Sequence, residues 1–184
     1  MTDIDDLLRR VSAEAGATVE RLPAAVTAQE LARAEESLGF ALPPVLARLY
    51  HEVANGCFGP DYQLFPLLGD GRTAVATYHK ERAGSVSGGS PYWPAGILPI
   101  MDWGCGMYAA VDCRSSEGTV LLFEPNGIED DWHHAWYLDA ESLAGWLETW
   151  LAGAGWYEED PAEDAEPAEP RPWEMARQRL SEKK

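Results

Sequence analysis

The sequence predicts an α+β fold: one domain in which an antiparallel sheet of about four strands or more is covered by N-terminal helices and a C-terminal helix. Three observations predict it. Helical periodicity dominates residues 1–82, three short apolar runs bounded by turn residues follow between 97 and 124, and an amphipathic segment comes after them. Because the helices precede the strands instead of alternating with them, an antiparallel sheet is favoured over a parallel one.

The first two helices are marked by their spacing and their ends. Apolar residues recur at helical spacing over residues 3–15, where Thr2 can cap the helix. The second helix is expected to begin at Thr27, which forms a capping-box pattern with Glu30. Gly39 suits its C-terminal end.

Two further helices and two loops are expected before the strands. Leu42-Pro43-Pro44 opens a third helix, because proline is tolerated in the first helical turn, and Asn55-Gly56 ends it. Residues 57–68 read as a loop that leads into a short extended piece. Residues 73–82 are predicted helical, and residues 84–96 form a long loop rich in glycine and proline.

The strands and the last helix follow in order. Residues 97–102, 107–112 and 119–124 are strand candidates whose short connections favour an antiparallel meander. A further extended stretch is expected over residues 135–138. Asp139 can cap the last helix, whose apolar residues fall at i, i+3, i+4, i+7 and i+8. They are Leu143, Trp146, Leu147, Trp150 and Leu151.

The composition of the C-terminal part predicts that a linker and a short terminal segment follow a single domain. Residues 1–157 form the domain, and residues 158–172 alternate acids with Ala and Pro, which is typical of an extended linker. Residues 173–184 can form a short terminal helix that either frays or docks. As a further hypothesis, the acidic run could occupy a basic groove, with Trp173 as its anchor.

Charge and composition exclude several classes of function. The 184 residues contain 31 acidic and 14 basic side chains, a net charge of −17, which argues against direct nucleic-acid binding and against docking on an anionic membrane. Residues 83–157 alone hold ten acids and one base. An N-terminus without an apolar run, together with three cysteines that suggest no disulfide framework, favours a cytoplasmic protein.

The order of several motifs resembles a known family. They are Ile4 to Leu8, Glu35-Glu36-Ser37-Leu38-Gly39, Leu42-Pro43-Pro44, Tyr50, Asn55-Gly56-Cys57-Phe58-Gly59, Leu64 to Leu67, Leu98 to Gly106 running on to Asp112, and the C-terminal amphipathic helix. In this order they resemble the Smi/Knr-like family of the SUKH superfamily, over about residues 1–152.

This resemblance implies an α+β fold with one sheet and a binding function. Bacterial relatives are often immunity proteins that neutralise a toxin effector domain, frequently a nuclease or deaminase, and others are interaction modules. We therefore expect a non-enzymatic protein-binding module, with an immunity protein for a basic toxin domain as the leading hypothesis. A housekeeping scaffold in cell-envelope or regulatory assemblies is the alternative, and a hydrolase is the third. The sequence leaves the partner and the oligomeric state open.

Acids and aromatic anchors are the expected contacts for a basic partner. The candidate partner-binding residues are Tyr92, Trp93, Asp102, Trp103, Glu124, Glu129, Asp130, Asp131 and Trp132. Each has a structural alternative. Tyr92 and Trp93 can cover the core, and Asp102-Trp103 can simply precede a turn. The acids from 124 to 131 can belong to a solvated loop whose Trp132 packs into the core.

No catalytic, metal or cofactor site is expected. Adjacent residues on a strand point to opposite faces, so His133 and His134 are not expected to ligate one ion. The chain has no GxSxG motif, and its glycine-rich loop lacks the lysine of a phosphate-binding loop. We therefore predict no catalytic residues.

Overall fold

A five-stranded sheet is the centre of the fold. The computed structural model describes residues 3–61, 63–159 and 169–182. Every neighbouring pair of strands is antiparallel, and the spatial order follows the chain order. The strands are β1 (Ile97–Gly104), β2 (Met107–Asp112), β3 (Val120–Phe123), β4 (Trp136–Ala140) and β5 (Arg171–Pro172). The predicted α+β class and the antiparallel meander are confirmed.

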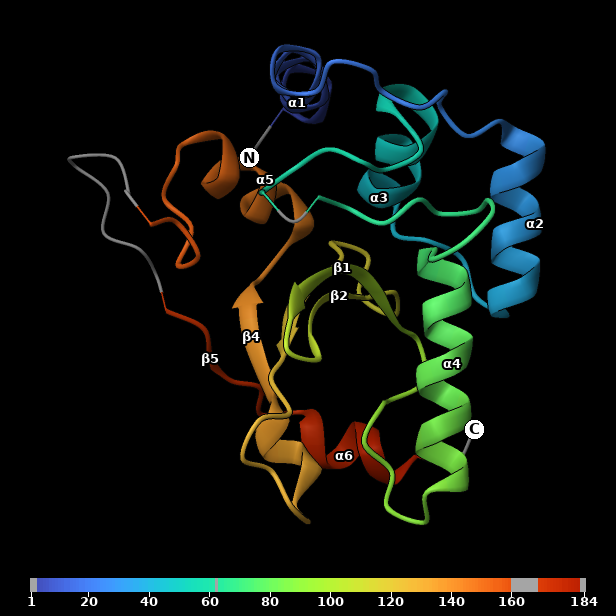
Figure 1. Ribbon diagram of the computed structural model, residues 1–184, viewed down its shortest axis with the longest axis vertical. Coiled ribbons are helices and arrows are strands. Elements are labelled where there is room, and N and C mark those ends of the chain that lie inside the picture. Colours follow the sequence, from blue (N-terminus) through green and yellow to red (C-terminus); the bar gives the residue numbers. More distant parts are fainter. Residues whose placement is uncertain (1–2, 62, 160–168, 183–184) are drawn as a thin grey trace.

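Helices surround this sheet. They are α1 (Ile4–Thr18), α2 (Ala28–Leu38), α3 (Pro44–Arg48), which continues as a π-helical turn η1 (Leu49–Val53), α4 (Ala74–Ser87), α5 (Leu143–Leu151) and α6 (Ala176–Ser181), with a 3-10 turn η2 (Trp132–Ala135). Figure 1 shows α4 beside both β1 and α2, α1 near α5 at the top of the view, and α6 near η2 at the bottom. Within the described ranges, no helix is long and apolar enough to cross a membrane.

The helix ends confirm some sequence predictions and correct others. The capping box between Thr27 and Glu30 is formed at both of its hydrogen bonds, and Gly39 ends α2 at φ +79°. Helix α1 is capped by Asp3, whose carboxylate accepts from two backbone N–H groups, whereas Thr2 lies outside the described residues. Asp139 does not cap α5; Ser142 does, through its hydroxyl.

The predicted loop 84–96 is shorter than expected, because α4 runs on to Ser87. The remaining loop turns inward. Trp93 is fully buried among Tyr108, Phe123 and Trp136, with ring centroids 4.9–5.5 Å away. Its indole N–H donates to the carbonyl of Ile97 at 2.8 Å. Trp93 is therefore a core residue, and its expected role as an exposed anchor is corrected: the ring offers a partner no surface.

The C-terminal segment docks. Most of the predicted linker 158–172 lies outside the described residues, but Arg171–Pro172 pair with β4 as β5. Trp173 is buried beside Trp136, at 6.2 Å between ring centroids. Arg179 of α6 forms a buried ion pair with Asp112, with N···O distances of 2.7 and 3.0 Å. Trp173 thus packs into this chain and is not available to anchor a partner.

Candidate functional site

A cleft of about 710 Å³ lies between α1, α5 and the loop that follows η1. One wall carries Glu14 and Thr18 of α1 and Val19, which follows the helix, and the loop contributes Gly59 to Asp61 and Gln63. The end of β1 supplies Trp103. The end of α5 and the segment after it supply the rest: Trp150, Leu151, Gly153, Tyr157, Glu158 and Glu159. We call this site the acidic cleft.

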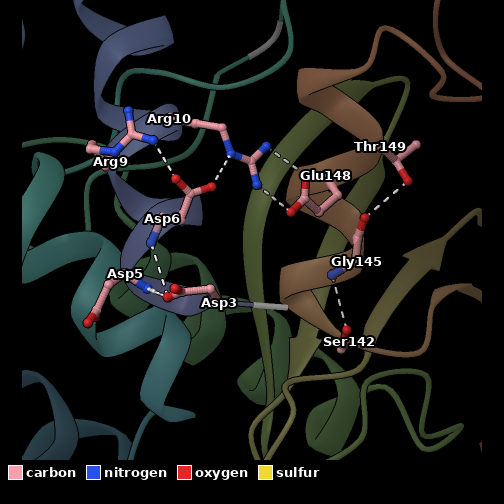
Figure 2. A network of polar contacts seen from close by, with 9 residues as sticks. All are labelled: Asp3, Asp5, Asp6, Arg9, Arg10, Ser142, Gly145, Glu148 and Thr149. Atoms are coloured by element: carbon pink, nitrogen blue, oxygen red, sulfur yellow. Dashed lines mark hydrogen bonds and ion pairs between the residues drawn. The ribbon is translucent and has the colours of Figure 1, made fainter. Parts of the chain in front are cut away.

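An ion-pair network holds the two helical walls of the acidic cleft together. Figure 2 shows Arg10 of α1 reaching Glu148 of α5. The guanidinium donates two hydrogen bonds to the Glu148 carboxylate, at 2.8 and 2.5 Å, and a third to Asp6 at 2.8 Å. Glu14 follows Arg10 by one helical turn, and Leu151 follows Glu148 by about one turn. The network therefore fixes the spacing of the walls just beside the cleft.

Trp103 and Tyr157, two aromatic residues that line the acidic cleft, belong to a packed cluster of rings. The Trp103 and Tyr157 rings lie 4.7 Å apart between centroids, and Trp156 lies 5.3 Å from Trp103. Asp139 orients the cluster, because its two carboxylate oxygens accept from the indole N–H groups of Trp146 (3.0 Å) and Trp156 (3.1 Å). Burial raises the pKa of Asp139, although these two hydrogen bonds oppose the shift. Asp139 is therefore a structural acid, not a helix cap.

The charge of the acidic cleft is wholly negative. Four of its lining residues are acids (Glu14, Asp61, Glu158 and Glu159), and none of its described lining residues is basic. Burial raises the pKa of Glu158, and the nearby charge of Asp61 raises it further. Burial also raises the pKa of Tyr157, whose hydroxyl is buried without a hydrogen-bond partner among the described residues. The cleft therefore offers carboxylates and ring surface to a cation.

Of the nine residues singled out from the sequence, only Trp103 lines the acidic cleft. Its neighbour Asp102 instead pairs with Arg72 and accepts a hydrogen bond from the backbone N–H of Gly104 at 2.7 Å. Arg72 also donates to the Tyr108 hydroxyl at 2.9 Å. The charge of Asp102 is thus already matched by a cation within the chain.

The other predicted residues gather around the loop between β3 and β4. Tyr92 and Trp132 are both half-buried, with ring centroids 5.5 Å apart, and both pack on Phe123. Glu124 accepts hydrogen bonds from the backbone and side-chain N–H groups of Asn126, at 2.7 and 2.6 Å, so it stabilises the turn. Glu129, Asp130 and Asp131 are exposed. This loop remains a predicted contact surface separate from the acidic cleft.

The two histidines of this loop do not lie on a strand. They belong to the 3-10 turn η2, and their ring centroids are only 3.8 Å apart. The expectation that they point to opposite faces is wrong, because it assumed an extended backbone that begins only at Trp136.

Sequence reasoning missed most of the acidic cleft. Local patterns place Glu14 in a predicted helix, Asp61 in a predicted loop and Glu158 in the predicted linker. These carboxylates are 47 and 97 positions apart in the chain, so no local pattern connects them. The one local signal is Trp156-Tyr157 followed directly by two acids.

Comparison with known proteins gives one family. Residues 25–149 match the sequence model of the SMI1 / KNR4 family (SUKH-1). No curated protein matches the chain. Of the residues that line the acidic cleft, only the loop residues 59–61 and 63 and Trp103 fall within the matched range.

Proposed function

The chain belongs to the SMI1 / KNR4 family (SUKH-1), and from this membership we propose that it is a non-enzymatic immunity protein that neutralises a basic toxin effector domain through the acidic cleft. The family includes immunity proteins, which is the basis for the class of function. The observation that carries the choice of site is a large cleft with four carboxylates, aromatic rings and no basic lining residue among those described.

The chemistry of the acidic cleft fits an arginine or lysine side chain of the partner. Carboxylates bind a guanidinium or ammonium group through charge-assisted hydrogen bonds. Trp150 and Tyr157, which line the cleft and are only partly buried, can provide cation–π and stacking surface. A toxin that acts on nucleic acid needs basic side chains to hold phosphate. Occupying those side chains would therefore block its substrate.

The position of the cleft suits partner selection. Its walls come mainly from α1 and from residues after 149, outside the range that matches the family. The matched range builds strands β1 to β4, helices α2 to α4 and most of α5. The cleft is therefore where this chain's own sequence can specify a partner on a shared fold.

The test compares the native chain with two charge-reversed variants. The cleft variant carries Glu14→Lys and Asp61→Lys, and the matched loop variant carries Glu129→Lys and Asp130→Lys; all four carboxylates are exposed. Each tagged protein is used to capture partners from lysate of its own organism, and the association rate of the purified partner is then measured at two salt concentrations. We expect the cleft variant to associate about tenfold more slowly and with a weaker salt dependence.

Co-expression supplies the second readout. The native chain should restore growth of cells that express the captured domain, and the cleft variant should fail to do so. If only the loop variant loses the partner, the contact surface is the loop and not the acidic cleft. If the native chain captures only envelope or regulatory proteins and protects against no toxin, the immunity proposal is wrong and the scaffold alternative replaces it.

A further inference from the structure

A second group of chemically active side chains lies at the opposite end of the sheet from α1 and α5, near α6 (Figure 1). Asp131, His133 and His134 each offer one ligand atom, and these atoms lie within 4.8 Å of one another. The Asp131 carboxylate is 3.0 Å from Nδ1 of His133 and 3.9 Å from Nε2 of His134. The group belongs to neither the acidic cleft nor the core.

The short 3-10 turn η2 explains why these side chains converge. A 3-10 helix has three residues per turn, so side chains at i and i+3 lie above one another. This spacing relates Asp131, the residue at the N-cap position of η2, to His134. His133 is the more buried of the histidines, with 17% of its side chain exposed against 64% for His134. One ligand is thus held in place while the other two can rotate.

The distances are close to those of a transition-metal site. Ligand atoms about 2.0–2.1 Å from a tetrahedral zinc ion lie about 3.3 Å from one another. The ligand atoms are at most 4.8 Å apart, so the exposed Asp131 and His134 side chains need to shorten a separation by no more than about 1.5 Å to reach this spacing. Imidazole nitrogens and a carboxylate oxygen are ligands that Zn²⁺ accepts, and water can complete the coordination.

Arg177 of α6 contacts two of the three proposed ligand residues. Its guanidinium lies 2.8 Å from Nε2 of His133 and 3.9 Å from the Asp131 carboxylate. A guanidinium can only donate, so Nε2 of His133 is the acceptor and Nδ1 carries the proton that faces Asp131. The cation on α6 and the group on η2 thus form one contact between the C-terminal segment and the β3–β4 loop.

We propose that Asp131, His133 and His134 form a binding site for a divalent transition-metal ion of the zinc type, and that the ion and Arg177 bind there in competition. Coordination through Nε2 of His133 replaces the guanidinium directly. Coordination through Nδ1 moves the ring proton to Nε2, where it faces the N–H of Arg177. Either mode displaces Arg177, and the positive charges of the ion and the guanidinium also repel each other.

The competition makes one contact of the docked C-terminal segment sensitive to metal. Arg177 and Glu174 line a pocket of about 390 Å³ with the two histidines, Tyr137 and Trp173. Loss of the Arg177 contact frees that side chain, while the buried Arg179–Asp112 ion pair still holds α6. The ion therefore loosens one contact of the segment without releasing it.

Calorimetric titration of the full chain with Zn²⁺ alone tests the proposal. The protein carries no histidine tag and has Cys105→Ser, because Cys105 is an exposed free thiol that can bind zinc elsewhere. We expect one saturable site whose affinity falls at least tenfold in Asp131→Asn and in His134→Asn, since even residues behind metal ligands change affinity by about 10- to 100-fold. Asp130→Asn, an exposed neighbouring acid, is the matched control and should leave the affinity unchanged.

Arg177→Ala tests the competition with Arg177 independently of the existence of the metal site. Removing the guanidinium should raise the zinc affinity about threefold or more. The variant lacks both the hydrogen bond that occupies Nε2 of His133 and the charge that repels the ion. Absence of saturable binding, or equal affinity in the native chain, Asp131→Asn and His134→Asn, would overturn the site. Unchanged affinity in Arg177→Ala would overturn the competition. Neither result bears on partner binding at the acidic cleft, since the two sites share no residue.

Discussion

Asn55 and Gly56 connect the end of η1 to the loop that lines the acidic cleft. The Asn55 side chain donates to the carbonyl of Leu68 at 2.8 Å and accepts from the N–H of Leu67 at 2.7 Å. Gly56 has φ +70°, and its α-carbon approaches the Phe65 backbone so closely that a methyl group would overlap the Phe65 carbonyl. The sequence predicted this pair as a helix end, but its second role in holding residues 57–68 depends on contacts that appear only after folding.

Gly56→Ala is therefore expected to be costly. The substitution combines the strain of a left-handed backbone, about 1–2 kcal/mol, with overlap against backbone that cannot rotate away, for a total loss of roughly 3 kcal/mol. Gly39→Ala is the matched control, since Gly39 has a similar φ of +79° but open space around it. Urea unfolding of both variants measures the difference. Equal losses in the two variants would show that the loop moves aside without cost.

The ion pairs between α1 and α5 make the packing of two elements depend on pH. Hydrogen bonds from Arg10 hold the pKa of Glu148 below its usual value of 4.5. A lowered folded-state pKa contributes stability that is present above the unfolded value and is lost as pH falls through the folded value. Glu148 and Arg10 therefore stabilise the walls of the acidic cleft at neutral pH and cease to do so in acid.

Glu148→Gln should be less stable than the native chain at pH 7, and the difference should shrink as the pH falls below about 4.5. Urea unfolding at pH 7, 5, 4 and 3 measures the difference at each pH. Glu36→Gln, which changes an exposed acid of α2, is the control and should show no such trend. A Glu148→Gln difference that stays constant down to pH 3 would contradict the role of Arg10.

Elements were predictable where their signals are local. The capping box of α2 and the strands β1 to β3 follow from residues within a few positions of one another, and the structure confirms them. The local sequence does not fix the start of α5, because Asp139 and Ser142 are both good capping residues. Two distant indole N–H groups bind the Asp139 carboxylate, which leaves Ser142 to cap the helix. The local sequence cannot predict that distant indole groups will bind the Asp139 carboxylate.

For the whole molecule, the C-terminal segment contributes to the fold beyond the range that matches the family. It adds β5 to the edge of β4, covers Trp136 with Trp173 and inserts Arg179 beside Asp112. Arg179 also donates to the carbonyl of Ala95 at 3.1 Å, so it joins the C-terminal segment to the loop before β1. Composition predicted a linker and a short helix here, but burial of the helix depends on a partner acid 67 positions earlier in the chain.

A chain that ends after Glu159 should therefore unfold at a lower temperature and a lower urea concentration than the full chain. In the full chain, Arg179→Met should lower the free energy of unfolding by about 3–5 kcal/mol, which is much of the effect of the truncation. The substitution leaves the Asp112 carboxylate buried without its cation. Arg177→Met is the matched control on the same helix: its guanidinium is mostly exposed, so the unfolding midpoint should change little. Identical midpoints for the full and shortened chains would show that the docked segment adds no stability.

Because the shortened chain keeps every residue of the acidic cleft, it should still bind a partner of that cleft below its own unfolding temperature. Stability and partner binding are thus separable, since the C-terminal segment supports the sheet while α1, α5 and the loop after η1 form the cleft.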